Sequence, residues 1–183
     1  MLSHSPEWRE RIVEEAERAL GSPAETLAER LIETRAVIEE AVRLYPPLVA
    51  ISRAAIEPDE LAGRRIRRGA MVVIAPYVLH RHWLLWDRPD IFDPTRFLDG
   101  GRERIDRYAY LPFGAGPRSC IGSVFALQEA TIMVATIARN FELQVPASYR
   151  VWPVHRVTLR PQGGLPMAVR SRIRSGGRRP TFS

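Results

Sequence analysis

The chain has 183 residues, of which 45% are hydrophobic and 26% charged, as in an ordinary globular domain. Its formal net charge is +6, and all 27 of its basic residues are arginine. No apolar run approaches the roughly 20 residues that span a bilayer, and a single cysteine excludes an intramolecular disulfide. A cytoplasmic protein without a membrane span is therefore expected.

The positive charge could attract nucleic acid or an acidic protein. Nucleic-acid binding has no further support, because the sequence has neither zinc-finger spacing nor a basic run interleaved with aromatic residues. An acidic protein is the partner that the charge favours.

Two helical segments are predicted first. Residues 6–20 carry apolar side chains at helical spacing, with a proline in the first turn and Gly21 after the last. Ser22, followed by a proline, opens a second helical segment that should break near residues 31–34. Pro46 and the proline after it end this segment.

The rest of the chain alternates between irregular and regular patterns. Residues 48–75 should form short strands and turns, because apolar β-branched runs alternate with proline and glycine. Residues 77–110, rich in aspartate, proline and aromatic residues, should be largely irregular. A buried helix is expected over residues 121–141, followed by strands with a turn at Gly163 and Gly164.

These elements predict a mainly α protein with small β-sheets, of the α+β class. The length suffices for one domain with a core, and no internal repeat is visible. Residues 171–183 should be a disordered basic tail.

The only cysteine, Cys120, lies in the stretch FGAGPRSCIG just ahead of the last predicted helix. A lone cysteine is usually a small buried hydrophobe, but its neighbours here indicate a metal ligand. Gly114 and Gly116 let the backbone bend close to a flat or bulky group, and Gly122 leaves room beside the sulfur. The helix start and Arg118 should lower the pKa of the thiol and favour the thiolate, which is the form that ligates metal.

This stretch resembles the haem-binding loop of cytochromes P450, Phe-x-x-Gly-x-Arg-x-Cys-x-Gly. All five fixed positions match, at Phe113, Gly116, Arg118, Cys120 and Gly122. Two other kinds of glycine-rich loop do not fit, because the sequence has no dinucleotide-type strand–turn–helix unit here and no Gly-Lys-Ser/Thr phosphate loop.

Two further segments resemble the same family. Glu40 and Arg43 in EAVRLYPP match its Glu-x-x-Arg helix, and Arg96 in FDPTRF matches its Pro-x-Arg-Phe segment. Taken alone, a Glu–Arg pair at this spacing is usually a surface ion pair of little energy. The resemblance, which runs from about Ser5 to Val169, implies instead a buried Glu–Arg–Arg network that holds the irregular stretch beneath a haem.

The resemblance also implies a haem b cofactor with Cys120 as the axial ligand of its iron, because thiolate ligation favours cleavage of the O–O bond. Arg118 and Arg53 would bind the haem propionates, since guanidinium groups pair well with carboxylates. The residues implied to bind haem are Cys120, Arg118, Arg53, Phe113, Gly114 and Gly122.

Other candidate residues have weaker support. His80 and His82 could suggest a metal pair, but no further ligand stands nearby with fitting spacing, so a structural or haem-periphery role is favoured. Two stretches resemble substrate-lining segments of the family, one after the Glu-x-x-Arg helix and one before the Gly-Gly turn. Their residues are Val49, Ala50, Ile51, Ser52, His155, Val157 and Thr158.

The resemblance implies that residues 1–170 are the C-terminal portion of a single cytochrome P450 domain, which is incomplete here. For the whole enzyme, it implies a monooxygenase that inserts one oxygen atom from O₂ into an organic substrate. The electrons would come from a ferredoxin, a flavodoxin or a flavin reductase, whose acidic face could meet Arg102, Arg104 and Arg107. The family's oxygen-activating helix with its acid–threonine pair has no counterpart here, so no catalytic residue is identified and Met1 is expected to be an internal or artificial start. The alternative is a truncated remnant without catalysis or a simple haem-binding module.

Overall fold

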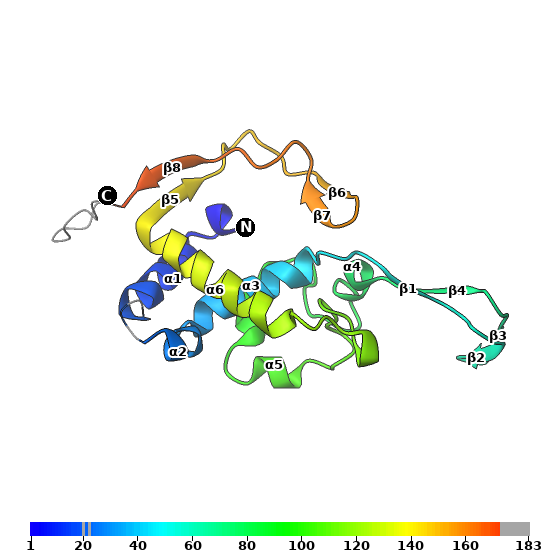
Figure 1. The fold of residues 1–183 in the computed structure, drawn as a ribbon. Coiled ribbons are helices and arrows are strands. Elements are labelled where there is room, and N and C mark those ends of the chain that lie inside the picture. The colour runs from blue at the N-terminus through cyan, green and yellow to red at the C-terminus, as the bar shows by residue number, and fades with distance from the viewer. Residues whose placement is uncertain (20, 22, 173–183) are drawn as a thin grey trace, which may run out of the picture.

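The computed structural model describes residues 1–19, 21 and 23–172 (Figure 1). The features predicted at Leu20, at Ser22 and beyond residue 172 lie outside the described residues. Helices form the body of the molecule, and two-stranded antiparallel sheets lie above them and extend to the right in Figure 1, which confirms the predicted mainly α fold with small sheets.

Three long helices pack against one another: α1 (Pro6–Ala19), α3 (Ile32–Leu44) and α6 (Ser123–Asn140). The buried face of α1 includes Trp8, Ile12 and Ala16, as its apolar periodicity predicted. α6 crosses the other two helices (Figure 1), and its Ala135 is fully buried in one cluster with Ala16.

The second predicted helical segment is broken where the sequence indicated. α2 (Ala24–Leu27) and the 3-10 helix η2 (Ala28–Arg30) lead to Leu31, whose backbone leaves the helical region with φ −101° and ψ 53°. α3 then runs to Leu44 and stops ahead of Pro46, because proline cannot continue a helix.

The start of α3 is capped by a side chain from another helix. Leu31, its N-cap residue, offers no side-chain hydrogen bond. The buried carboxylate of Glu15 in α1 instead accepts the backbone N–H groups of Glu33 (2.7 Å) and Thr34 (2.8 Å) and the Thr34 hydroxyl (2.7 Å). A carboxylate at this end also interacts favourably with the helix dipole, so Glu15 fixes α1 against α3.

Replacing Glu15 with alanine is expected to lower the free energy of unfolding by about 1–3 kcal/mol, because poorly solvated N–H groups lose their acceptor. Glu15→Gln should be intermediate, since its amide oxygen accepts hydrogen bonds without a charge. Glu14→Ala, one residue earlier and exposed, is the control and should change stability little. Chemical denaturation followed by circular dichroism measures all three, and equal effects at the two positions would contradict the capping role.

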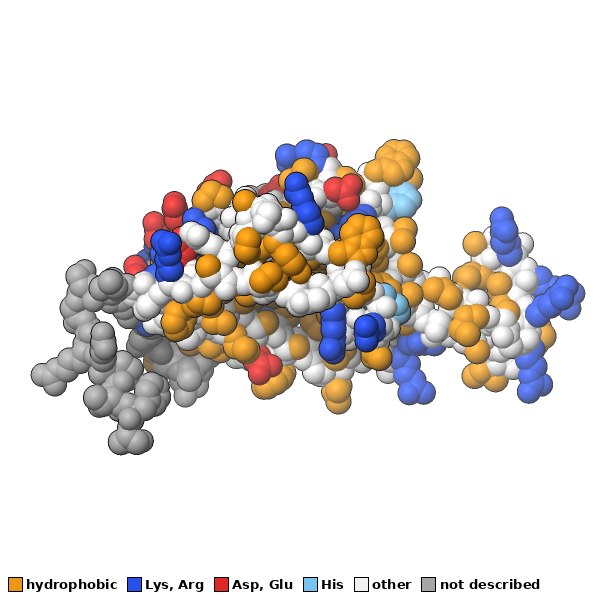
Figure 2. Space-filling model, turned by 90° about the horizontal axis from the view of Figure 1, so that it is seen from above, with side chains coloured by type: hydrophobic (Ala, Val, Ile, Leu, Met, Phe, Trp, Pro, Cys, Tyr) orange, Lys and Arg blue, Asp and Glu red, His pale blue; other side chains and the backbone are white. Residues whose placement is uncertain are grey.

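Residues 51–74 form an arm that extends away from the helices (Figure 1). β1 (Ile51–Ala54) pairs antiparallel with β4 (Met71–Ile74), and a hairpin of β2 (Asp59–Leu61) and β3 (Arg64–Ile66) ends the arm. Basic side chains gather at its tip (Figure 2). The strands and turns predicted for residues 48–75 are confirmed.

A second set of strands arches over the helices (Figure 1). β5 (Phe141–Gln144) pairs antiparallel with β8 (Ala168–Ser171), and β6 (Pro153–His155) with β7 (Leu159–Pro161). Gly163 and Gly164, both with positive φ, make the predicted turn, but it follows β7 instead of closing a hairpin. Beneath the arch lies a hollow of about 520 Å³ lined largely by apolar side chains, Ile137 and Leu165 among them.

The stretch between the arm and α6 is mostly irregular, as predicted. It also contains several short helices, which were not predicted. The short helices of the chain outside the α2–η2 segment are η1 (Leu2–His4), α4 (Pro76–Leu79), η3 (Pro94–Phe97), α5 (Gly101–Arg104) and η4 (Gly116–Arg118). This stretch takes its shape from hydrogen bonds to α3, which build the candidate site described below.

The prediction that the last helix is buried is wrong for most of its length. Within α6 only Thr131 and Ala135 are buried, while Val124, Phe125 and Met133 are exposed. A helix that is apolar nearly all round is usually covered on every side, but here α1 and α3 cover one side. Among the described residues, no helix is long and apolar enough to cross a membrane.

Candidate functional site

Two fully buried charges lie side by side on α3. Arg43 donates to both carboxylate oxygens of Glu40, from Nε to Oε2 at 2.6 Å and from Nη2 to Oε1 at 2.8 Å, and neither side chain is exposed. Two bonds from a planar guanidinium to one carboxylate are strong and directional. Positions i and i+3 share a helix face, so α3 itself brings the pair together.

The same ion pair holds the irregular stretch in place. Arg43 Nη1 donates to the carbonyl oxygens of His80 (2.6 Å) and Pro89 (2.8 Å), and Nη2 donates to that of Ile91 (3.1 Å). The backbone N–H of Asp93 donates to Glu40 Oε1 at 2.9 Å. Residues 80–93 are thus fixed to α3 through their backbone.

Arg96 joins this pair from the 3-10 helix η3. Its Nε lies 3.5 Å from Glu40 Oε1, at ion-pair distance but without hydrogen-bond geometry, and its Nη2 donates to the carbonyl oxygen of Arg88 at 3.0 Å. The Arg96 side chain is only 11% exposed. The three residues therefore lie together as one network.

His80, a fully buried histidine, contacts the network. Its Nδ1 lies 3.1 Å from the carbonyl oxygen of Arg43, and its Nε2 accepts the backbone N–H of Leu111 at 2.8 Å. Burial lowers the pKa of His80 to about 4, so the ring is neutral near pH 7. His82 bonds locally instead, accepting the N–H of Leu84. The described residues contain no group of three His, Cys, Asp or Glu that could hold a metal ion.

Tyr110 anchors the chain next to Leu111. Its hydroxyl donates to the carbonyl oxygen of Glu39 at 2.9 Å, and its ring lies 5.1 Å from that of Phe97. Burial raises the pKa of this phenol, so the hydroxyl stays protonated and can donate. The chain that enters the segment with the cysteine therefore has two side-chain anchors, His80 and Tyr110.

The cysteine loop (residues 111–122) folds back on itself. The N–H of Cys120 donates to the carbonyl oxygen of Phe113 at 2.9 Å, and that of Gly114 donates to Leu111 at 3.2 Å. Gly114 has φ of 75°, a conformation that side chains with a Cβ rarely adopt. The loop leaves Cys120 exposed.

The helix after the loop begins slightly later than the sequence indicated. Gly122 is the N-cap of α6 and lies outside the helix, so Cys120 stands two residues ahead of the cap. The N–H of Ser123 donates to the carbonyl oxygen of Cys120 at 3.3 Å and closes the turn into the helix. Cys120 therefore lies in the turn that leads directly into α6.

The surface beside Cys120 is open and apolar. A Cβ placed on Gly122 would meet nothing within 4 Å, and Ile121 is completely exposed. On the other side, a Cβ on Gly114 would lie 3.6 Å from Ile51 Cδ1, so the start of β1 borders the loop. The exposed Cys120 thus has open space on the side of Gly122, which is compatible with a bulky flat ligand.

The two elements that border this surface, η4 and β1, each carry an arginine. Arg118 in η4 and Arg53 in β1 are both exposed, and neither pairs with a carboxylate among the described residues. Arg53 shares a strand face with Ile51, because side chains alternate along a strand. Its Nη1 donates to the carbonyl oxygen of Ser52 at 2.8 Å. Both guanidinium groups can bind carboxylates, so the residues fit a flat apolar group with acidic substituents.

Comparison with known proteins assigns this loop and network to a family. The family profile described as Cytochrome P450 matches residues 1–165. This chain belongs to the cytochrome P450 family. The match includes the cysteine loop and the buried network, so the resemblance drawn from their motifs is confirmed.

Relatives match along most of this P450 chain. Cyclooctatin synthase of Streptomyces melanosporofaciens is 39% identical over 161 residues, which are 87% of this chain and 35% of that protein. The putative cytochrome P450 132 of Mycobacterium tuberculosis is 36% identical over 174 residues, or 94% and 38% of the two chains. The crystal structure of the cytochrome P450DA heme domain aligns with a TM-score of 0.85 and 30% identity, over 94% of this chain and 38% of that one. The chain thus spans little more than a third of these relatives.

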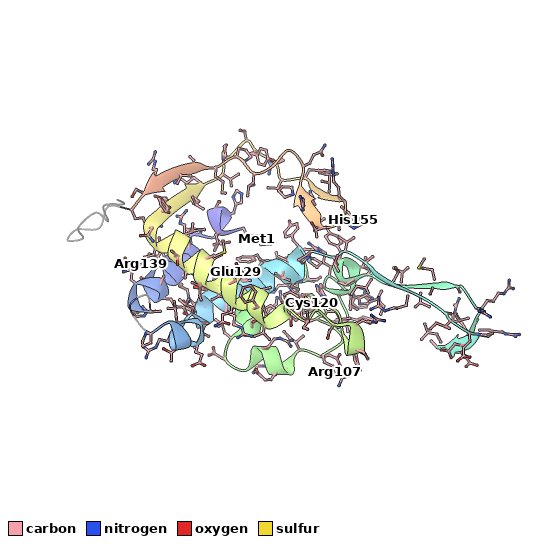
Figure 3. The ribbon with its side chains drawn as sticks, in the orientation of Figure 1. Met1, Arg107, Cys120, Glu129, Arg139 and His155 are labelled. Carbon is pink, nitrogen blue, oxygen red and sulfur yellow. The ribbon has the colours of Figure 1, made fainter. Side chains whose placement is uncertain are left out.

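The two P450-like segments expected to line a substrate site lie near each other. The N–H of Leu159 donates to the carbonyl oxygen of Pro47 at 2.9 Å, which ties the β6–β7 hairpin to the chain just ahead of residues 49–52. Figure 3 shows His155 on this hairpin, above Cys120 in the view. Ile51 borders the cysteine loop. Within the described part of the chain, the other candidates form no hydrogen bond to that loop: Val49, Ala50, Ser52, His155, Val157 and Thr158.

The arginines expected to meet a P450 redox partner are not equivalent. Arg102 is 40% exposed but already has partners, with its Nε 3.7 Å from Glu39 Oε1 and its guanidinium 5.0 Å from the ring centre of Tyr110. Arg104 and Arg107 are exposed, and Figure 3 places Arg107 below the cysteine loop. Arg104 and Arg107 are therefore more available than Arg102 to an incoming protein.

Two residues that support the candidate site were not predicted from the sequence. Glu15 caps α3, and Tyr110 anchors the chain at the start of the cysteine loop. A glutamate within a helix and a tyrosine ahead of a loop are common, so no local pattern marks either role. Both depend on elements that meet only in the folded chain.

Proposed function

We propose that this chain is the haem-thiolate part of a P450 monooxygenase, which inserts one oxygen atom from O₂ into an organic substrate. The observation that carries the proposal is the exposed Cys120 on a glycine-bent loop whose entrance is fixed to the buried Glu40–Arg43 pair. Family membership implies haem as the cofactor. When bound, a haem with a thiolate ligand supplies O₂ activation.

Each residue of the site has a distinct part in holding haem b. Cys120 would ligate the iron, and Arg118 and Arg53 would pair with the propionates. Phe113, Gly114 and Gly122 would lie against the ring, because they border the open surface beside the sulfur. The Glu40, Arg43 and Arg96 network keeps the stretch that leads into this loop in one conformation.

The substrate is proposed as a small organic molecule that enters between residues 49–52 and the tip of the β6–β7 hairpin. Relatives bear names as different as cyclooctatin synthase and cytokinin hydroxylase, so similarity selects no compound. The electron donor is proposed as a ferredoxin, a flavodoxin or a flavin reductase that approaches Arg104 and Arg107. No role with nucleic acid is proposed, and a cytoplasmic location stays a prediction.

The ferrous–CO absorption spectrum of the chain supplied with haem tests this proposal. The wild-type chain should give the strongly red-shifted Soret band of a thiolate-ligated haem, and Cys120→Ser should lose it because an alcohol is a poor anionic ligand at neutral pH. Ser119→Ala, a neighbouring change that leaves the thiol intact, is the control. A red-shifted band that persists in Cys120→Ser would overturn the assignment of the ligand.

A second candidate is a haem-binding module, or a remnant, without monooxygenase activity. It rests on the residues of the cysteine loop, which would hold a haem and none of which has an assigned role in oxygen activation. A thiolate-type spectrum without substrate-dependent electron consumption supports this second candidate, whereas turnover of any organic substrate excludes it.

A further inference from the structure

His80 lies where the buried network meets the cysteine loop. It is fully buried and bonds to Arg43 twice, since its carbonyl oxygen accepts from Arg43 Nη1 at 2.6 Å and its Nδ1 lies 3.1 Å from the Arg43 carbonyl oxygen. Its Nε2 is 2.8 Å from the backbone nitrogen of Leu111. The sequence favoured a structural or haem-periphery role for this histidine over a metal site, and His80 has no part in the proposed contacts to haem.

The two partners determine which nitrogen of His80 carries the proton. The Leu111 backbone nitrogen is a donor, so Nε2 must be the acceptor and hold no proton. The Arg43 carbonyl oxygen is an acceptor, so Nδ1 must carry the hydrogen. The ring is therefore fixed in one neutral form, with each nitrogen matched to one partner.

Hydrogen bonds continue from Leu111 to the cysteine. The Leu111 carbonyl oxygen accepts the N–H of Gly114 at 3.2 Å, and the Phe113 carbonyl oxygen accepts the N–H of Cys120 at 2.9 Å. A shift of Leu111 would move both peptide groups that shape the turn. One imidazole thus joins a network on α3 to the first residue of the loop.

We propose that His80 is a positioning residue for the cysteine loop, acting through the hydrogen bond that its Nε2 accepts from Leu111. The haem-binding part of this role rests on the proposed function, but the bond itself does not. The competing explanation is packing alone, because the ring also lies 5.2 Å from that of Tyr110 and 6.4 Å from that of Trp86. Packing alone would not depend on which ring nitrogen is replaced.

Two amide variants separate these explanations. Glutamine at position 80 extends far enough to place an oxygen near the Nε2 position, so it can still accept from Leu111. Asparagine is shorter and reaches the Nδ1 position, so it keeps a donor for Arg43 but leaves Leu111 unpaired. The matched control is His82→Gln on the same segment, where the histidine bonds only locally.

The first measurement is amide hydrogen exchange at Leu111 and Gly114 in the full haem-free chain. His80→Asn should speed exchange at both amides by about tenfold or more, as expected when a buried donor loses its acceptor. His80→Gln and His82→Gln should change it by less than about threefold. Equal acceleration in the Asn and Gln variants would overturn the proposal in favour of packing.

Two further measurements keep the test decisive. The ¹⁵N chemical shifts of His80 in the unmutated chain should show a protonated Nδ1 and a free Nε2, and the opposite tautomer would overturn the proposal even if a variant fails to fold. Haem titration should show affinity falling about tenfold in His80→Asn and little in His80→Gln. If the unmutated chain binds no haem while the exchange pattern holds, the proposed function fails and the role of His80 in the loop stands.

Discussion

Replacing Arg43 with methionine is expected to lower the free energy of unfolding by about 3–5 kcal/mol, because a buried carboxylate loses the only charged group that hydrogen-bonds to it. Glu40 would remain fully buried with a negative charge, held by the backbone N–H of Asp93 at 2.9 Å and by the longer contact to Arg96 at 3.5 Å. The carbonyl oxygens of His80 and Pro89 would lose their donor as well. The loss therefore combines an uncompensated charge with unpaired polar groups.

Arg35→Met provides the matched control on the same helix. Arg35 is 58% exposed and lies 3.7 Å from the carboxylate of Glu39, so its removal should change stability by less than about 1 kcal/mol. Urea denaturation of the haem-free chain, followed by circular dichroism, measures both variants. The double variant Glu40→Met/Arg43→Met should recover part of the loss, since it removes both fully buried charges and leaves only Arg96, which is 11% exposed, without its carboxylate partner. An Arg43→Met variant as stable as the control would show that the pair is not structurally important.

The buried pair shows both what the sequence reveals and what it leaves open. The spacing of Glu40 and Arg43 places them on one helix face, but spacing alone favours a surface pair. Only the resemblance to a known family predicted burial. The carbonyl groups that Arg43 binds come from a stretch with no helical or strand periodicity, so their positions depend on the network itself.

Two errors in the predicted elements have the same physical origin. Phe141 follows Ile137 at helical spacing, which extended the predicted helix, but the strand β5 there is defined by pairing with β8, a strand distant in the sequence. An apolar pattern all round a helix, as in α6, is typical of a helix with neighbours on every side. In the described part of the chain only one side of α6 is covered, and the pattern of apolar residues does not reveal how many neighbouring elements there are.

Stability should also fall as the pH is lowered from about 7 to 4, in part because of His80. Burial lowers the pKa of its ring from the usual 6.5 to about 4 in the folded chain. Between these values the unfolded chain binds a proton and the folded chain does not, so unfolding is favoured as the pH falls. Protonation of His80 does not reduce the free energy of unfolding above pH 6.5, and it reduces this free energy by up to about 3 kcal/mol by pH 4. The charged groups that lower this pKa further are Arg43 on α3 and the adjacent Arg81.

His80→Gln isolates this contribution, because an amide does not titrate in this range while the other groups remain. Glu39 acts in the opposite direction: burial raises its pKa, so its contribution is present at low pH and declines as the pH rises through the folded value. Glu39 is common to both proteins and cancels in their difference. As the pH falls from 7 to 4, the unfolding free energy of the wild-type chain should therefore decrease steadily relative to that of His80→Gln. A difference that stays constant over this range, measured by urea denaturation at each pH, would mean that His80 is not held neutral in the folded chain.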